Sequence, residues 1–246
     1  MNCRFLPFLI LFLFSFKSFD SSSKSDRNTD PKLLASNSKT SIESRCKSFY
    51  STLDQNHFSL PNFDVFLAAF QGFEHLKQQG QILNNVLTVI DFSLSSKEER
   101  LWVIDMSCQR VLLQSLVAHG KNSGLEFATH FSNENESFKS SLGFFLTGEE
   151  YQGKHGTSLR LDGLEYGIND KARERAVVIH GADYVNKKLA QTQGYVGRSL
   201  GCPAVPNELH RQLIQLIKNK NNFSKRNGEY PYFLLDQLAR KQSIAI

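Results

Sequence analysis

Short apolar runs separated by polar turns fill the middle of this chain, and they restrict the folds open to it. Each run has the length and composition of a β-strand. The runs are Val86–Phe92, Leu101–Asp105, Arg110–Ala118, Phe144–Thr147, Ser158–Leu161 and Ala176–Ile179, and Tyr230–Leu235 fits a further strand. With 246 residues, 40% of them hydrophobic, the chain can bury one full core and a small appendage. These features predict a β-rich α+β domain.

Helical patterns lie on either side of these strands. Asn62 can cap a helix that closes near Gly80 and carries a stripe of phenylalanines at helical spacing. The stripe consists of Phe63, Phe66, Phe70 and Phe73. We expect it to pack on the main domain or within a small N-terminal helical element, and a partner-binding helix is the alternative. A second helix is predicted to start at Pro206, with a buried face made of Leu209, Leu213, Leu216 and Ile217.

The first 44 residues have the pattern of an export signal followed by a linker. Arg4 precedes the apolar run Phe5–Phe16, which predicts a signal peptide over residues 1–19. That run is shorter than the roughly 20 apolar residues of a membrane span, but no Ala-x-Ala cleavage site follows it. Both a cleaved leader and an uncleaved N-terminal anchor therefore remain open, and membrane association is expected only through the latter. Residues 20–44 are rich in Ser, Lys, Asp and Asn and predict a flexible linker.

The charge balance argues against a nucleic-acid partner. The formal net charge is +5, and loss of Arg4 and Lys17 with the leader would leave 5 − 2 = +3. Basic and acidic residues are interleaved, and no aromatic-basic recognition motif is present, so a solvated surface is expected.

The cysteines indicate an intermolecular disulfide or a free reactive thiol rather than a metal site. Without Cys3 of the leader, Cys46, Cys108 and Cys202 remain, which is an odd number for an exported protein. A disulfide between Cys46 and Cys108 stays open. The chain has no Cys-x-x-Cys or His-Glu-x-x-His pattern, and no metal or other cofactor is expected.

Cys202 and His180 form a candidate nucleophile–base pair. His180 follows the apolar run Ala176–Ile179, and Cys202 lies 22 residues later, after Gly201. A thiolate is a strong nucleophile, and an imidazole can hold the proton that the thiol gives up. Gly201 lets the backbone turn sharply and bring N–H groups close to a reacting oxygen.

The alternative interpretation is structural, because many cysteines are small core residues and many His–Gly pairs mark turns. The chain also contains the pairs His119–Gly120 and His155–Gly156. Composition alone does not choose among the three His–Gly pairs.

The neighbourhood of this candidate pair resembles a known active-site signature. His180-Gly181-Ala182, followed by GRSLGCPA over Gly197–Ala204, is similar to the motif of the L,D-transpeptidase (YkuD-type) family. That family has a His–Gly pair, a variable spacer and then Ser-x-Gly-Cys. The runs at residues 140–143, 147–156 and 158–164 resemble its murein L,D-transpeptidase branch. This chain departs from many members in having Leu200 in place of a second His, and Pro203 and Ala204 after the cysteine.

The resemblance extends over Val86–Phe223 and implies both a fold and an organisation. It implies a β-sandwich-like catalytic domain over residues 82–224. Residues 45–81 are then the N-terminal helical element, and residues 225–246 form a C-terminal tail. The location implied is the periplasm or cell envelope of a bacterium.

The resemblance also implies a reaction on peptidoglycan stem tetrapeptides. Cys202 would form a thioester at the diamino acid, release the terminal D-Ala and pass the acyl group to a second stem. His180 would be the base, the Gly181 carbonyl would orient its ring, and N–H groups at Gly201 and Cys202 would hold the oxyanion. Two alternatives remain: an L,D-carboxypeptidase that uses water, and a catalytically degenerate protein that only binds peptidoglycan.

Several further residues are candidates for the substrate wall. Arg198 could pair with a substrate carboxylate or form a surface salt bridge. Ser199 is expected to shape the loop by local hydrogen bonding. Tyr184, His155 and Arg160 complete the predicted wall. The segment Glu149–His155 is either a charged surface hairpin or, as the resemblance suggests, part of a lid.

Overall fold

The structure is a computed structural model that describes residues 42–82, 84–218 and 232–236. These residues belong to one compact unit, Lys39–Ile246. The predicted leader and nearly all of the predicted linker lie outside the described residues. Residues 42–44, expected as the end of the linker, instead begin a helix over residues 42–51.

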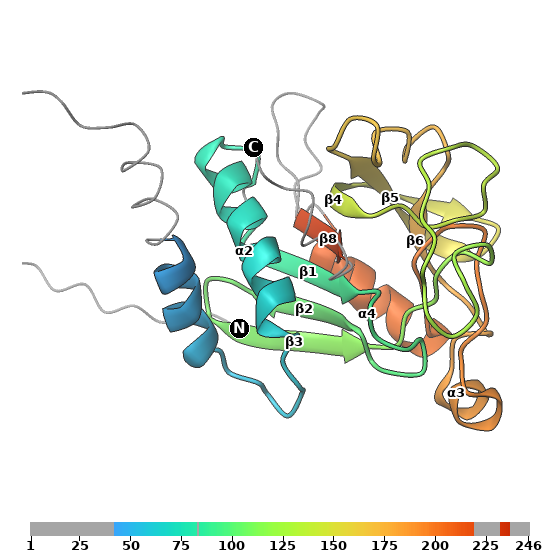
Figure 1. The fold of residues 1–246 in the computed structure, drawn as a ribbon, viewed down its shortest axis with the longest axis horizontal. Coiled ribbons are helices and arrows are strands. Elements are labelled where there is room, and N and C mark those ends of the chain that lie inside the picture. Colours follow the sequence, from blue (N-terminus) through green and yellow to red (C-terminus); the bar gives the residue numbers. More distant parts are fainter. Residues whose placement is uncertain (1–41, 83, 219–231, 237–246) are drawn as a thin grey trace, which may run out of the picture. The chain divides into compact units, whose positions relative to one another are not determined.

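Eight strands form one hydrogen-bonded series in the order β3-β2-β1-β8-β4-β5-β6-β7 (Figure 1). The strands are β1 (Val86–Asp91), β2 (Leu101–Asp105), β3 (Arg110–Ser115), β4 (Gly143–Gly153), β5 (Gly156–Gly163), β6 (Val178–Gly181), β7 (Ala204–Val205) and β8 (Tyr232–Asp236). The strand β8 joins the two halves, since it pairs in parallel with β1 and antiparallel with β4. This strand lies within residues 225–246, assigned to a C-terminal tail, and it matches the further strand predicted at Tyr230–Leu235.

The main core lies between the two halves of the strand series. Val103 and Leu113 from the first half share a hydrophobic cluster with Phe145, Leu159 and Ile179 from the second. Helix α4 (Asn207–Ile217) contributes Leu213, Ile214 and Ile217 to the same cluster. This packing gives the β-rich, sandwich-like α+β architecture, which confirms the predicted fold class.

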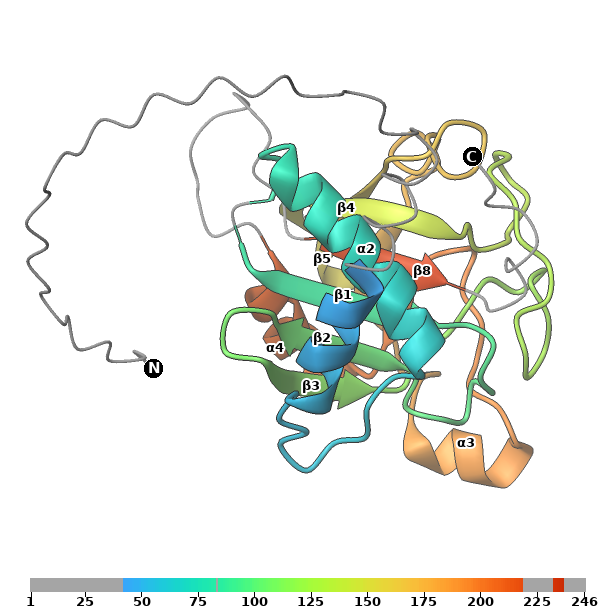
Figure 2. The same cartoon turned by 60° about the vertical axis from the view of Figure 1, so that its left-hand side comes forward.

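Strand β1 is buried on both faces, which explains its continuous apolar sequence. Val86 and Ile90 face the main core, whereas Leu87 and Val89 face a second core beneath helix α2 (Phe63–Gln78). Figure 2 shows α2 crossing in front of β1.

The predicted phenylalanine stripe is the buried face of α2. Phe66, Phe70 and Phe73 pack in the second core together with Trp102 of β2. Asn62 caps the helix by accepting a hydrogen bond from the Asp64 N–H at 2.9 Å. The N-terminal helices therefore share a core with the sheet.

Two features go beyond the sequence prediction. Strands β4 and β5 are longer than the predicted Phe144–Thr147 and Ser158–Leu161, and they meet at Gly153 and Gly156. The segment Glu149–His155 is therefore the charged hairpin that was one of its two predicted alternatives, with Lys154 and His155 at its tip. Helix α3 (Lys187–Gln193) was not predicted, although Asn186 caps it and Gly194 ends it at φ 81°.

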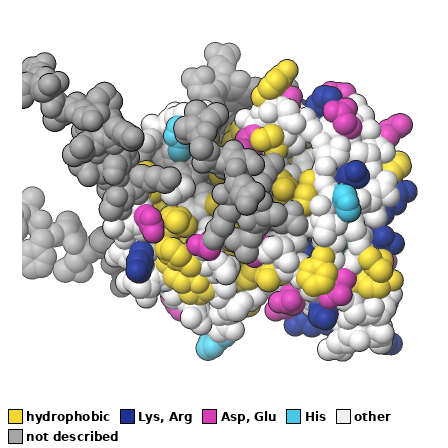
Figure 3. Space-filling model, viewed as in Figure 1, with side chains coloured by type: hydrophobic (Ala, Val, Ile, Leu, Met, Phe, Trp, Pro, Cys, Tyr) yellow, Lys and Arg dark blue, Asp and Glu magenta, His cyan; other side chains and the backbone are white. Residues whose placement is uncertain are grey.

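The surface has the mixed charge that the sequence predicts. In Figure 3, basic and acidic side chains lie interspersed on the face shown. Arg173 pairs with Glu149 and Asp162, and Lys218 pairs with Glu150. In the described part of the chain, no helix is long and apolar enough to cross a membrane.

Candidate active site

Strand register brings the two motif segments side by side. Strands β6 and β7 pair in parallel, with His180 opposite Ala204. Cys202 comes two residues before Ala204 and so lies level with Val178 at the start of β6. The topology therefore joins the His–Gly pair to the loop Gly197–Cys202, called here the nucleophile loop.

The Cys202 thiol is half-buried and held by the backbone of the neighbouring strand. Its Sγ lies 3.8 Å from the carbonyl oxygen of Ala176. Burial raises the pKa of the thiol above its ordinary value of 9.0, while the Val178 N–H and the charges of Arg175 and Lys154 oppose that rise. The thiol is consequently protonated near neutral pH.

The His180 ring is oriented by the carbonyl that was expected to orient it. Nδ1 lies 2.9 Å from the Gly181 oxygen, and a carbonyl can only accept, so Nδ1 carries the proton and Nε2 presents a lone pair. Burial lowers the pKa of His180 below 6.5; the Gly181 bond opposes this change, and the positive charges of His155, Lys154 and His210 reinforce it. The imidazole is therefore neutral near pH 7 and can accept a proton.

A neutral thiol and a neutral imidazole suit general-base catalysis rather than a preformed ion pair. In this structure the thiol donates to the Ala176 carbonyl instead of the His180 ring. Proton transfer to Nε2 thus requires the S–H bond to turn away from that carbonyl.

His155 covers the base from the tip of the β4–β5 hairpin. Its ring stacks on His180, with centroids 4.4 Å apart and an interplanar angle of 22°. The stacking follows from the pairing of β5 with β6, in which Ser158 lies opposite His180. Of the three His–Gly pairs, the structure brings two into direct contact.

Ser199 shapes the nucleophile loop. Its Oγ donates to the Cys202 carbonyl at 2.6 Å and accepts from the Gly201 N–H at 3.0 Å. The side chain is 5% exposed, so it faces the loop rather than a ligand. The Gly201 N–H, one of the two groups predicted to hold the oxyanion, donates to Ser199 in this structure. The Cys202 N–H is the remaining candidate of the two.

Gly201 and Gly181 are both needed for close packing. Gly201 has φ +125°, and a Cβ there would lie 2.9 Å from the Lys139 carbonyl oxygen. A Cβ on Gly181 would lie 2.4 Å from the Asn207 side chain of α4. Any other residue would displace the base or the nucleophile loop.

The remaining predicted wall residues occupy different places. Tyr184 is half-buried, its ring lies against Gly197 of the nucleophile loop, and burial together with the Cys202 charge raises its pKa to about 12. Arg160 pairs with Glu149 at 3.0 Å and lies over the Tyr151 ring, so it belongs to the charged hairpin.

Arg198 is exposed and braces a loop. Its guanidinium donates to the carbonyl oxygens of Lys121 and Gly124, at 3.1 and 3.4 Å. These partners are carbonyls, not the carboxylate that a surface salt bridge would require.

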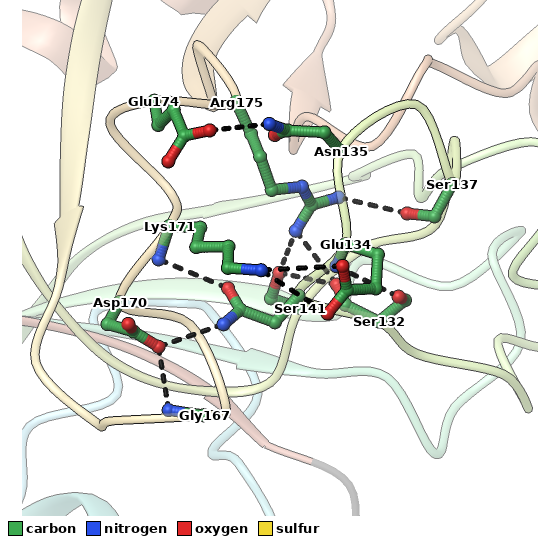
Figure 4. A network of polar contacts seen from close by, with 11 residues as sticks. Ser132, Glu134, Asn135, Ser137, Ser141, Gly167, Asp170, Lys171, Glu174 and Arg175 are labelled. Atoms are coloured by element: carbon green, nitrogen blue, oxygen red, sulfur yellow. Dashed lines mark hydrogen bonds and ion pairs between the residues drawn. The ribbon is translucent and has the colours of Figure 1, made fainter.

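The sequence reasoning did not identify Arg175, which lies beneath the nucleophile loop. Its guanidinium donates to oxygens of the segment 132–141, as Figure 4 shows. No local pattern marks this arginine, because it ends a polar turn outside the motif.

Among the residues that the structure describes, no group of three or more His, Cys, Asp or Glu could hold a metal ion. Cys46 is buried and Cys108 is exposed, and no disulfide joins these two residues. The open question of a disulfide between them is thereby answered in the negative.

Comparisons with solved structures return distant matches. Bd1075 of Bdellovibrio bacteriovorus is 16% identical with a TM-score of 0.37, and the match covers 62% of this chain and 48% of that one. An L,D-transpeptidase of Xylanimonas cellulosilytica is 15% identical with a TM-score of 0.31, and the match covers 62% of this chain and 61% of that one. This chain thus spans about half of the first structure and three fifths of the second.

No curated protein matches the sequence. Residues 59–224, however, match the model of the L,D-transpeptidase catalytic domain. This range includes helix α2 and strands β1 to β7. The match spans more than half of the chain, and the protein therefore belongs to the L,D-transpeptidase catalytic domain family.

Proposed function

We propose that this protein is a cysteine-dependent murein L,D-transpeptidase of the branch with the GRSxGCPA motif. It acts after export, in the bacterial cell envelope, on stem tetrapeptides of peptidoglycan. One observation carries the proposal: the Nδ1 of His180 is bound to the Gly181 carbonyl, which leaves Nε2 as a base beside the loop that holds Cys202.

The first half-reaction transfers an acyl group to sulfur. Cys202 gives its proton to Nε2 of His180 as Sγ attacks the carbonyl between the diamino acid and D-Ala. The Cys202 N–H holds the resulting oxyanion. The C–N bond breaks, the D-Ala amine takes the proton from His180, and a thioester remains.

The second half-reaction regenerates the thiol. An acceptor amine attacks the thioester and passes a proton to His180, a new amide forms, and the sulfur leaves and is reprotonated. The Gly181 carbonyl stabilises the imidazolium in both halves. Each step therefore uses the same base in alternating protonation states.

The donor peptide would be held by the residues nearest the two reacting groups. We assign His155 and Tyr184 to this wall, since His155 stacks on His180 and Tyr184 contacts the nucleophile loop. Arg198, Ser199 and Arg160 support it indirectly, by bracing the loop and the hairpin.

Hydrolysis is the competing outcome. Leu200, which stands where many family members have a histidine, is 56% exposed beside the nucleophile. An apolar residue here offers no hydrogen bond to an acceptor amine, and water would then resolve the thioester as in an L,D-carboxypeptidase.

Mass spectrometry of purified tetrapeptide muropeptides incubated with the protein tests the proposal. New cross-linked dimers with release of D-Ala support transfer, and tripeptides alone mean hydrolysis. Cys202→Ser should abolish either product, because a hydroxyl is much harder to deprotonate, whereas Cys108→Ser serves as the matched control. If the folded protein gives neither a product nor a carbapenem adduct on Cys202, the remaining alternative is a protein that only binds peptidoglycan.

A further inference from the structure

A half-buried arginine, Arg175, lies directly against the nucleophile loop. Arg175 precedes Ala176, whose carbonyl contacts the Cys202 sulfur. A Cβ built on Gly201 would lie 3.5 Å from Nη2 of Arg175, so the guanidinium lies next to the residue before the nucleophile. Neither Arg175 nor Ala176 belongs to the motif around His180 and Cys202.

The hydrogen bonds of Arg175 go to uncharged oxygens. The guanidinium donates to the Ser132 carbonyl at 2.8 Å, the Lys139 carbonyl at 2.7 Å, the Ser137 hydroxyl at 3.3 Å and the Ser141 hydroxyl. These bonds tie the segment 132–141 to the turn before β6. Ser140 of this segment donates in turn to the Gly201 carbonyl at 3.1 Å.

The acidic side chains of this network have other partners, as Figure 4 shows. Glu134 pairs with Lys171 at 3.3 Å, Asp170 accepts from Asn133 and Gly167, and Glu174 accepts from Asn135. Within the described residues, no carboxylate of the network forms an ion pair with Arg175, although the negative charge of Glu134 still acts on the guanidinium.

We propose that Arg175 is a positioning residue for the nucleophile: it fixes the segment 132–141 beneath the nucleophile loop, and its charge stabilises the Cys202 thiolate. The inference rests on the proposed role of Cys202. It extends the active site to a cation that holds the leaving sulfur when the thioester resolves.

The electrostatic interaction between Arg175 and Cys202 has the sign that this placement of the guanidinium predicts. Burial lowers the pKa of Arg175, and the negative charges of Cys202 and Glu134 oppose that change. Three further groups act on the sulfur: Lys154 from the hairpin tip, the Val178 N–H from β6, and Tyr184. Because a nearby opposite charge shifts a pKa by about 1–3 units, the effect of losing the arginine on the Cys202 pKa should be measurable.

The pH profile of Cys202 alkylation by iodoacetamide, followed by intact mass, tests the inference. The exposed Cys108 is first removed by Cys108→Ser. Arg175→Gln should move the midpoint upward by about one unit and slow alkylation at pH 7 about tenfold. Arg175→Lys, which keeps the charge, should move it less. The matched control is Arg173→Gln, whose guanidinium pairs with Glu149 and Asp162 on the surface.

A second variant keeps the inference testable if Arg175→Gln fails to fold. Ser137→Asp places a carboxylate beside the guanidinium and neutralises it without removing it, so the midpoint should again rise. An unchanged midpoint in either folded variant overturns the inference. Alkylation needs no peptidoglycan, so it tests the role of Arg175 separately from turnover. If the alkylation midpoint shifts in a protein that shows no turnover, the proposed function is wrong and the inference about Arg175 holds.

Discussion

His119 and His180 are each followed by glycine and are both buried, yet their rings differ in how many nitrogens are hydrogen-bonded. His119 uses both nitrogens: Nδ1 accepts from Arg100 at 2.8 Å, and Nε2 donates to the Gly124 carbonyl at 3.3 Å. Among the hydrogen bonds of the described residues, His180 uses only Nδ1. An imidazole can act as a base only when a lone pair is accessible, so the same dipeptide is structural at His119 and leaves Nε2 open for the proposed role as base at His180.

His119, although structural, supports the candidate active site through its backbone. Its carbonyl accepts from the Ser199 N–H at 2.9 Å and so fixes one end of the nucleophile loop. Burial and the charge of Arg100 lower the pKa of His119 to about 4, and the Gly124 bond only partly offsets this. His119 is therefore neutral wherever the enzyme would work, and it orders the loop without exchanging protons.

The largest expected effect separates the two histidines by rate. His180→Gln keeps a donor for the Gly181 carbonyl but removes the base, so acylation of Cys202 should fall about 10²- to 10⁴-fold. Single-turnover kinetics with a carbapenem or tetrapeptide measures this loss. His119→Gln should lose much less, and an equal loss in both variants would show that the comparison is wrong.

The second-largest expected effect separates His119 from His180 by the loss of folding stability at acid pH. The unfolded chain takes up a proton at His119 below pH 6.5, but the folded protein resists it down to about pH 4. Folding stability should therefore fall as the pH drops through this window, by up to about 3 kcal/mol from this group. Urea denaturation of the parent and of His119→Gln at pH 7 and pH 4.5 gives the difference. His180 contributes in the same direction to both proteins, so equal acid sensitivity would contradict the assignment to His119.

The third effect concerns the buried arginine. Arg100 is 0% exposed, and it bonds the carbonyls of Val117 and Leu94 as well as His119. His119→Ala leaves one guanidinium N–H without its partner, which should cost about 1–3 kcal/mol at pH 7. A urea midpoint equal to that of the parent would mean that water or another acceptor replaces the imidazole.

Local patterns predicted the elements that local chemistry determines. The stripe Phe66, Phe70 and Phe73 with its Asn62 cap identified α2, because helix spacing and capping depend on neighbouring residues. The motif around His180 and Cys202 likewise identified two segments that the β6–β7 register brings together.

Long-range pairing and polar surfaces left no comparable signal. Strand β8 enters the sheet between β1 and β4, and no residue pattern specifies such a position. The outer half of the β4–β5 hairpin is solvated and polar in sequence, so the pattern predicted only the inner parts of these two strands. Arg175 was missed for the same reason, since its role depends on oxygens of the segment 132–141 that only the fold brings near.

The smallest expected effect tests whether a third His–Gly pair belongs with the base. His155 stacks on His180, and burial lowers the His180 pKa, with a smaller lowering from the positive charges of His155, Lys154 and His210. His155→Ala removes both ring and charge, and His155→Phe keeps only the ring. An aromatic stack contributes about 0.5–1.5 kcal/mol, so His155→Ala should reduce kcat/KM about 2- to 10-fold, whereas His155→Phe should retain most of it.

The pH profile distinguishes stacking from charge. Activity falls as the pH drops through the His180 pKa, so removing a neighbouring positive charge should move this acid limb toward pH 6.5 in both His155 variants. Rate against pH on a tetrapeptide donor measures the limb. If His155→Ala instead abolished acylation as completely as His180→Gln, the base would be on the hairpin, and His180 would resemble His119 in being a support.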